Sequence, residues 1–171
     1  FEGTVYMDDF ELTVVHPNPE DIEPVFWVST IANGDFEGTE TASFVAKENG
    51  GANAGAFVAP AFTDAIGKDG SRGIKVTSYA GATNDWDAQF WIAASKALPA
   101  GTEYRVTFDY RASAAVNVGT QAHGAPGSYL HNNAIGNVSF TTEWQHFEKS
   151  GFVSAEYQSI AFNLSADKAN G

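Results

Sequence analysis

Apolar and polar residues alternate along several short stretches of the chain. In the segment 103–113, for example, every second residue is apolar: Tyr104, Val106, Phe108 and Tyr110. Because successive side chains of a strand point to opposite faces, this alternation predicts a strand with one buried face. Similar patterns, or short apolar runs between turn residues, predict further strands at 55–58, 73–78, 86–94, 116–120, 136–141, 145–153 and 159–164.

Turn-forming residues separate these predicted strands. Gly, Pro, Asn and Asp cluster at 49–51, 68–70, 98–101 and 125–127, and long stretches with helical spacing are missing. On the order of ten short strands with such turns are typical of a sandwich. We therefore expect an all-β fold, a jelly-roll β-sandwich of two antiparallel sheets.

Composition limits the classes of function. The chain has 171 residues, enough for one domain with a core of its own, and it has no cysteine for disulfides or thiolate metal sites. It has no apolar run long enough to span a membrane. Its formal charge of -12, from 21 acidic and 9 basic residues, argues against nucleic acid and suits a neutral ligand or a divalent cation.

The first predicted strand contains an acidic residue among apolar ones. In the predicted strand Thr4–Val15, the even positions from 6 to 14 are Tyr6, Asp8, Phe10, Leu12 and Val14, so Asp8 interrupts an otherwise apolar face. A carboxylate on an apolar face must be paired, hydrogen-bonded or bound to a metal. Calcium, which takes carboxylate and carbonyl oxygens, is one partner. The alternative is an Asp that caps a turn or lies at the rim of the core.

Four motifs resemble those of carbohydrate-binding modules of families 4, 9, 16 and 22. Residues 33–37 (NGDFE) resemble the opening of such modules, and 98–112 resemble their middle strand. Residues 141–147 (TTEWQHF) are similar to their threonine–tryptophan strand entry, and 6–10 (YMDDF) are similar to their final strand. The order differs from the family, because the final-strand motif comes first here.

This resemblance implies a domain organisation. Residues 1–15 would be the closing strand of the sandwich, supplied from the N-terminus by a permutation or a swap between chains. Residues 16–30 would be a connector, and 31–171 the body of one carbohydrate-binding domain. The closing strand would lie beside the strand that starts near Asn33 and occupy the place after Gly171.

The resemblance also implies a structural Ca²⁺ ion. Its side-chain ligands would be Asp8 and Glu37, and backbone carbonyls would come from the region of Gly34 and from 73–75, which includes Lys75. Such an ion would join the first and last strands of the domain.

A ligand cleft is the second implied site. Trp86 follows Asn84-Asp85, as a stacking Trp does in family 4, and an exposed aromatic ring suits the apolar face of a sugar. By alternation, further polar and aromatic side chains are expected to point away from the core. The resemblance adds two residues of the loop 122–133 to the expected binding residues. The expected binding residues are Trp86, Gln89, Trp91, Arg111, Gln121, Tyr129, His131 and Asn163.

Packing roles stay open for two of these residues. Trp91 is a large aromatic in a strand, and such residues often serve packing alone. Arg111 has Asp109 and Asp87 as alternative partners and in that case does not touch ligand.

The favoured function is a non-catalytic module that binds xylan or xylo-oligosaccharides, with mixed-linkage β-glucan as a further ligand. It would tether a covalently linked xylanase or related glycoside hydrolase, in a secreted, periplasmic or cell-surface protein. One alternative is a protein-interaction or adhesion sandwich that binds no glycan. Another is a lyase or hydrolase, for which Asp87 and Asp109 are the candidate carboxylate pair.

Overall fold

A computed structural model describes residues 3–15, 27–48 and 58–167. This part of the chain is all-β, as predicted, with one short 3-10 turn, η1 (Lys68–Gly70), and no helix long and apolar enough to cross a membrane. The strands are β1 (Thr4–Val15), β2 (Trp27–Ser29), β3 (Phe44–Glu48), β4 (Val58–Thr63), β5 (Gly73–Thr77), β6 (Ala88–Leu98), β7 (Glu103–Ala112), β8 (Val116–Val118), β9 (Thr120–His123), β10 (Val138–Phe140), β11 (Gln145–Phe152) and β12 (Tyr157–Asn163).

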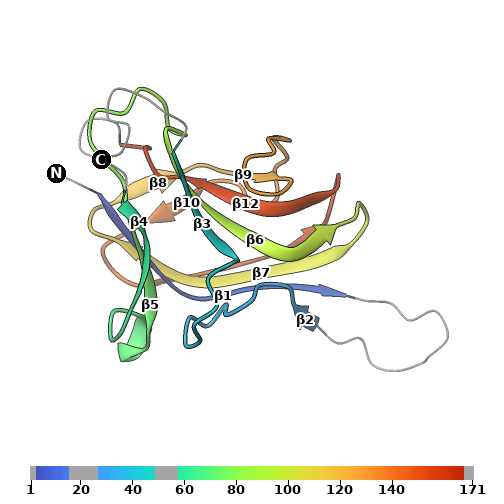
Figure 1. Cartoon of the computed structure of the whole chain (residues 1–171), viewed down its shortest axis with the longest axis horizontal. Helices are drawn as coiled ribbons and strands as arrows, with labels where there is room; N and C mark the ends of the chain where they lie inside the picture. Colours follow the sequence, from blue (N-terminus) through green and yellow to red (C-terminus); the bar gives the residue numbers. More distant parts are fainter. Residues whose placement is uncertain (1–2, 16–26, 49–57, 168–171) are drawn as a thin grey trace.

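Two antiparallel sheets lie face to face (Figure 1). The six-stranded sheet has the order β11-β7-β1-β5-β4, and β2 pairs with one end of β1. The four-stranded sheet has the order β3-β6-β12-β9, and β8 pairs separately with β10. The predicted antiparallel β-sandwich is therefore confirmed, whereas the jelly-roll connectivity stays a prediction.

Aromatic side chains fill the space between the sheets. Phe108 of β7 stacks on Phe10 of β1 at 5.1 Å and meets Phe162 of β12 edge-on at 5.8 Å. The alternation predicted for 103–113 is confirmed, since its apolar positions are buried. The contact between Phe108 and Phe162 joins the two sheets, and the outer face of β6, β9 and β12 carries the site described below.

The strand β1 lies inside the six-stranded sheet of its own chain. It pairs with β7 on one side and with β5 on the other. Its expected neighbour near Asn33 is not a strand, because residues 32–35 form a turn and residue 36 a bend. Thr4 and Asp167, near the two ends of the described chain, line the same small hollow.

A β-bulge in β1 corrects the predicted pattern of that strand. The register against β7 shifts between Asp8 and Glu11, and Asp9 has a left-handed φ of 47°. An extra residue reverses the alternation, so the core side chains are Val5 and Met7 before the bulge but Phe10, Leu12 and Val14 after it. Asp8 therefore does not continue the apolar face of Phe10, contrary to the prediction.

Two strands were absent from the predicted set. β2 falls within the expected connector, of which residues 16–26 lie outside the described residues, and β3 has no clear alternation in its five residues. The predicted strand 55–58 lies outside the described residues except for its last position, where β4 begins. Trp86 precedes β6 and lies in a turn.

Candidate functional site

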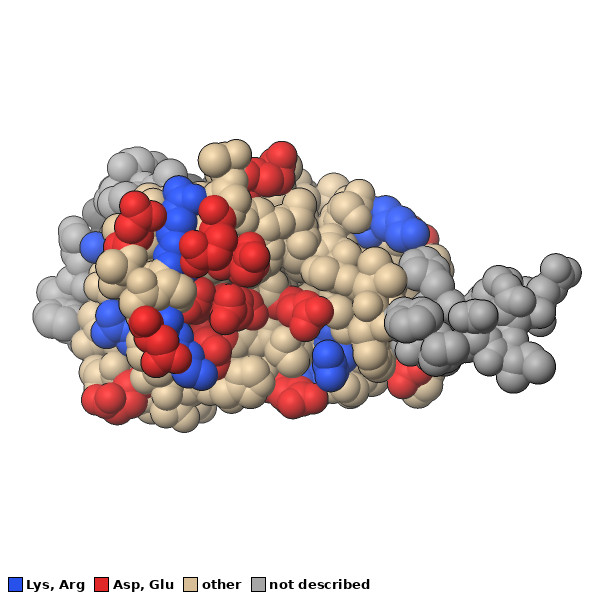
Figure 2. Space-filling view, turned by 90° about the horizontal axis from the view of Figure 1, so that it is seen from below, with Lys and Arg blue, Asp and Glu red and all other residues tan. Residues whose placement is uncertain are grey.

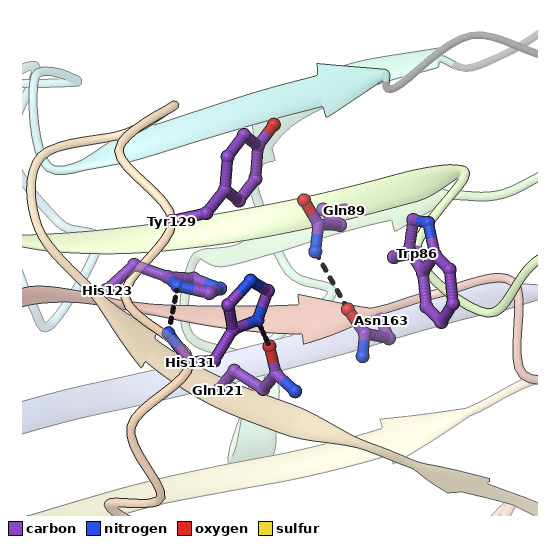
Figure 3. Close-up of a pocket in the computed structure, with 7 residues that line it drawn as sticks. All are labelled: Trp86, Gln89, Gln121, His123, Tyr129, His131 and Asn163. Atoms are coloured by element: carbon purple, nitrogen blue, oxygen red, sulfur yellow. Dashed lines mark hydrogen bonds between the residues drawn. The ribbon is translucent and has the colours of Figure 1, made fainter.

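A hollow of about 590 Å³ opens on the outer face of the four-stranded sheet. Its volume is that of a typical small-molecule pocket. Figure 3 shows the side chains that surround it, from β6, β9, β12, the turn before β6 and the loop after β9. The lining residues are Trp86, Gln89, Gln121, His123, Tyr129, His131 and Asn163. Six of the eight predicted binding residues thus lie together.

Trp86 forms one end of the hollow and is 52% exposed. The turn that carries it is held by the buried carboxylate of Asp87. Its Oδ2 accepts hydrogen bonds from the backbone amides of Thr83 at 2.8 Å and Asn84 at 3.0 Å. A cap of this kind fixes the local backbone, so the indole is presented to solvent from a defined position.

The opposite end is formed by Tyr129 and His131 on the loop after β9 (Figure 3). Their rings stack with an interplanar angle of 19°. His123 holds this loop, because its Nδ1 accepts the backbone amides of Leu130 at 3.0 Å and His131 at 3.2 Å. A ring nitrogen that accepts two N–H groups must be unprotonated, so the proton of neutral His123 lies on Nε2.

The charge state of His123 follows from its burial. Its side chain is fully buried, and burial followed by repulsion from His131 lowers the pKa of His123 to about 4. His123 is therefore neutral near pH 7. Its Nε2 has no hydrogen-bond partner among the residues that the structure describes.

A pair of amides forms the floor of the hollow. Gln89 of β6 is directly opposite Asn163 of β12 in the sheet, and its Nε2 donates to Asn163 Oδ1 at 2.9 Å (Figure 3). Gln121 Oε1 of β9 accepts a hydrogen bond from His131 Nδ1 at 2.7 Å in the tautomer whose proton lies on Nδ1. Each floor amide is thus held by a side-chain partner.

The structure places two of the predicted binding residues outside the hollow. Trp91 faces away from the core as predicted, but it is fully buried beneath His123 and Tyr129, with ring centroids at 4.8 Å and 5.7 Å. Arg111 belongs to β7 in the other sheet, where its guanidinium lies over the rings of Tyr6 at 4.3 Å and Trp144 at 5.3 Å.

His123 is the lining residue absent from the predicted set. It lies two positions after Gln121 on β9 and so shares its face of the strand. The same alternation that selected Gln121 therefore indicates His123 as well.

The expected metal ligands are brought together in part. Asp8 is 1% exposed, and its Oδ2 accepts the Lys68 amide at 2.6 Å and the Ser71 hydroxyl at 2.5 Å. Glu37 reaches the same loop, since its Oε1 accepts the Arg72 amide at 2.9 Å. Burial is the main cause that raises the pKa of Asp8, against the lowering effect of these hydrogen bonds.

Of the backbone positions expected to add ligands, Gly73 lies against this loop, since a Cβ on it would lie 3.1 Å from Gly67 N. Gly34 lies so close to the carbonyl of Phe10 that a Cβ would collide with it, and Lys75 pairs with Tyr6 across the β1–β5 ladder. In the described part of the chain, no three His, Cys, Asp or Glu residues are grouped as a metal site.

Oxygen atoms nevertheless converge beside Gly67. A Cβ on this glycine would lie 2.6 Å from Asp8 Oδ2 and 2.7 Å from the carbonyl oxygen of Arg72, and it would also collide with Ser71 Oγ. Carboxylate, carbonyl and hydroxyl oxygens are the donors that Ca²⁺ takes. The donor set at Asp8 therefore fits calcium in kind.

Acidic side chains gather on the outer face of the six-stranded sheet (Figure 2). A second hollow of about 530 Å³ lies there, with Asp9, Glu11, Asp35 and Asp109 in its lining. Lys68 Nζ and His146 Nδ1 lie 3.1 and 2.9 Å from Asp109 Oδ1. Burial first, and then repulsion from Asp8 and other acids, raises the pKa of Asp9.

The hollow on the four-stranded sheet is suited to binding a neutral, polar ligand. Among the described residues, its lining has no Asp, Glu, Lys or Arg. The carboxylate pair considered for hydrolysis is divided, because Asp87 caps the turn before β6 whereas Asp109 lies on β7 of the other sheet. Exposed aromatic rings can stack on an apolar face of such a ligand, and the amides between them can form hydrogen bonds with its hydroxyl groups.

Comparison with known proteins gives matches of two kinds. The family model CBM_4_9, described as "Carbohydrate binding domain", matches residues 28–165. Among solved structures, a similar chain described as "CBM4 structure and function" is 20% identical, with a TM-score of 0.41; the match covers 78% of this chain and 95% of that one. No curated protein matches.

Proposed function

Because the chain belongs to the CBM_4_9 family of carbohydrate-binding domains, which are non-catalytic, we propose that it binds a neutral β-1,4-linked polysaccharide in the hollow on the four-stranded sheet. Xylan is the first candidate and mixed-linkage β-glucan the second. The observation that carries this proposal is the half-exposed ring of Trp86 beside the Gln89–Asn163 amide pair, in a hollow whose described lining residues include no Asp, Glu, Lys or Arg.

Six of the seven lining residues contact the ligand in this proposal. Trp86 stacks on the apolar face of one sugar ring, and Tyr129 with His131 bounds the other end of the bound segment. The amides of Gln89, Gln121 and Asn163 bind hydroxyl oxygens. We expect dissociation constants in the micromolar range or weaker, since an open hollow leaves many hydroxyl groups in water.

Affinity electrophoresis on a panel of polysaccharides tests the proposal. Soluble xylan should retard the wild-type protein, mixed-linkage glucan should retard it to a similar or smaller extent, and an acidic polysaccharide such as polygalacturonate should not. Mobility unchanged by every neutral polysaccharide would contradict glycan binding and favour a protein-interaction role. In the full-length protein, we propose that the module tethers a linked glycoside hydrolase to this substrate and so raises its local concentration.

We also propose that Asp8 and Glu37 bind a structural Ca²⁺ ion against the loop 67–72. Support comes from the oxygen atoms that converge beside Gly67. When bound, the ion would supply positive charge that links β1 to this loop. Adding Ca²⁺ to chelator-treated protein should raise Tm, and Glu37→Gln should reduce that rise; equal melting curves with and without Ca²⁺ would refute the assignment.

We further propose that β1 is the closing strand of the module in a permuted order. Its place between β7 and β5, and a family match that begins after β1, support this assignment. Moving residues 1–15 to a position after Gly171, through a short flexible linker, should then give a protein that folds and binds the same glycan. A permuted protein that does not fold would argue against it.

A further inference from the structure

Trp91 lies directly beneath the hollow without lining it. Its side chain is fully buried and points away from the core between the sheets. The indole is stacked on His123 with an interplanar angle of 25° and meets Tyr129 at 71°. Ring contacts on this scale hold an indole in one orientation, so its single N–H points in a fixed direction.

That N–H starts a chain of hydrogen bonds with only one possible direction. An indole nitrogen donates and cannot accept. Trp91 Nε1 lies 3.1 Å from Gln89 Oε1, so the oxygen end of the Gln89 amide must face Trp91. The nitrogen end then donates to Asn163 Oδ1 at 2.9 Å. The Asn163 nitrogen is left on the far side of its amide, as Figure 3 shows.

The direction of this chain determines what the floor offers to a ligand. The oxygen and nitrogen of an amide are alike in size, so a Gln–Asn pair by itself can turn either way. With the indole as donor, Asn163 presents N–H groups. Ring and glycosidic oxygens of a sugar can only accept hydrogen bonds, so they match such a donor.

We propose that Trp91 is a positioning residue for glycan binding, which orients Gln89 and, through it, Asn163 so that Asn163 donates an N–H to an acceptor oxygen of the bound sugar. This role rests on the proposed function of the hollow. It adds that the ligand must place an acceptor oxygen over Asn163, and it gives a function to the indole N–H of the buried Trp91.

Two substitutions separate orientation from simple packing. Trp91→Phe keeps a buried ring but removes the N–H, and Asn163→Asp keeps size but replaces the donor by an acceptor. Each should weaken binding of xylohexaose about 5- to 10-fold by calorimetry, as expected for one hydrogen bond. Together they should weaken it no further than the stronger single variant, since they break the same chain. Trp27→Phe, at an exposed ring on β2, is the matched control and should bind like the wild type.

A second measurement does not depend on ligand. In ¹⁵N spectra of the unliganded protein, Trp91→Phe should shift the side-chain NH₂ signals of Gln89 and Asn163, and Trp27→Phe should leave them in place. Unchanged NH₂ signals in Trp91→Phe, or wild-type affinity in Asn163→Asp, would overturn the proposal. If the wild type itself binds none of the oligosaccharides, the proposed function fails, whereas these spectra still decide whether Trp91 orients the two amides.

Discussion

The hollow on the four-stranded sheet and the acidic face of the six-stranded sheet use polar side chains in opposite ways. Amides and aromatic rings line the first, with no Asp, Glu, Lys or Arg among the lining residues that the structure describes. The second has Asp9, Glu11, Asp35 and Asp109 around one hollow, with Asp8 buried beside the bulge of β1. The two regions belong to the outer faces of different sheets.

This difference shows how far the net charge of the chain informs its function. A formal charge of -12 argues against a nucleic-acid surface, but none of the acids that the structure describes lines the proposed cleft. We infer that the cleft selects a neutral ligand by stacking and hydrogen bonds, whereas the carboxylates around β1 act on stability. Substitutions in the two regions should therefore have separable effects.

Removal of the buried carboxylate should give the largest change. Asp8→Ala leaves the Lys68 amide and the Ser71 hydroxyl without their acceptor, which should lower the free energy of unfolding by about 3 kcal/mol. Urea denaturation followed by tryptophan fluorescence measures this loss. Glycan affinity, measured well below Tm, should change less than about twofold.

Asp64→Ala is the control for that substitution. The Asp64 side chain is 94% exposed and contacts Arg72 at 3.3 Å, so its loss should have little effect on unfolding. If both substitutions were equally mild, the hydrogen bonds to Asp8 would not carry the stability that we assign to them.

Removal of the exposed ring should give the reverse result. Trp86→Ala deletes the stacking surface and should weaken binding of xylohexaose about 10- to 100-fold, the usual range for an aromatic anchor. Its Tm should stay near that of the wild type, because the side chain is half exposed. Trp27→Ala, with a ring that lies under Arg105 at 5.5 Å, should leave affinity unchanged. Equal affinity losses in both variants would remove the distinction between the regions.

A smaller effect is expected from pH. The pKa of His123 in the folded protein is about 4, below its ordinary value of 6.5. Between these two pH values the unfolded chain therefore binds a proton at His123, whereas the folded chain does not. Stability from this group is complete above about pH 6.5 and is lost as pH falls toward 4. Asp8 and Asp9 act in the opposite direction, because their raised pKa values favour the protonated, folded state as pH falls.

The net result should be a loss of roughly 1 to 2 kcal/mol in unfolding free energy between about pH 7 and about pH 5. His123→Gln should flatten this slope in urea titrations at the two pH values. A variant with the same slope as the wild type would show that His123 does not cause it.

Alternation along the chain predicted which side chains point away from the core, but it could not predict on which of the two sheets they lie. Gln89, Gln121 and Asn163 meet in one hollow because their strands are neighbours in one sheet. Arg111 also points away from the core by the same rule. A sandwich has two outer faces, however, and the spacing of the strands along the chain does not show to which sheet β7 belongs. Contacts between residues far apart in sequence decide that.

Two further differences have local causes. Trp91 points away from the core between the sheets but is covered by the loop after β9. The path of this loop depends on hydrogen bonds from Leu130 and His131 to His123, and the sequence pattern of β6 does not predict them. The apolar side of β1 changes at the bulge near Asp9. A prediction that assumes strict alternation of side chains cannot detect a single added residue of this kind.

An NMR titration of the ¹⁵N-labelled wild-type protein with xylohexaose tests the central claim most directly. We expect progressive shifts of the Trp86 indole N–H and of the side-chain NH₂ signals of Gln89 and Asn163, and no shifts at the Asp8–Asp9 bulge. Shifts at the bulge with an unaffected Trp86 signal would place the glycan on the acidic face and contradict the account.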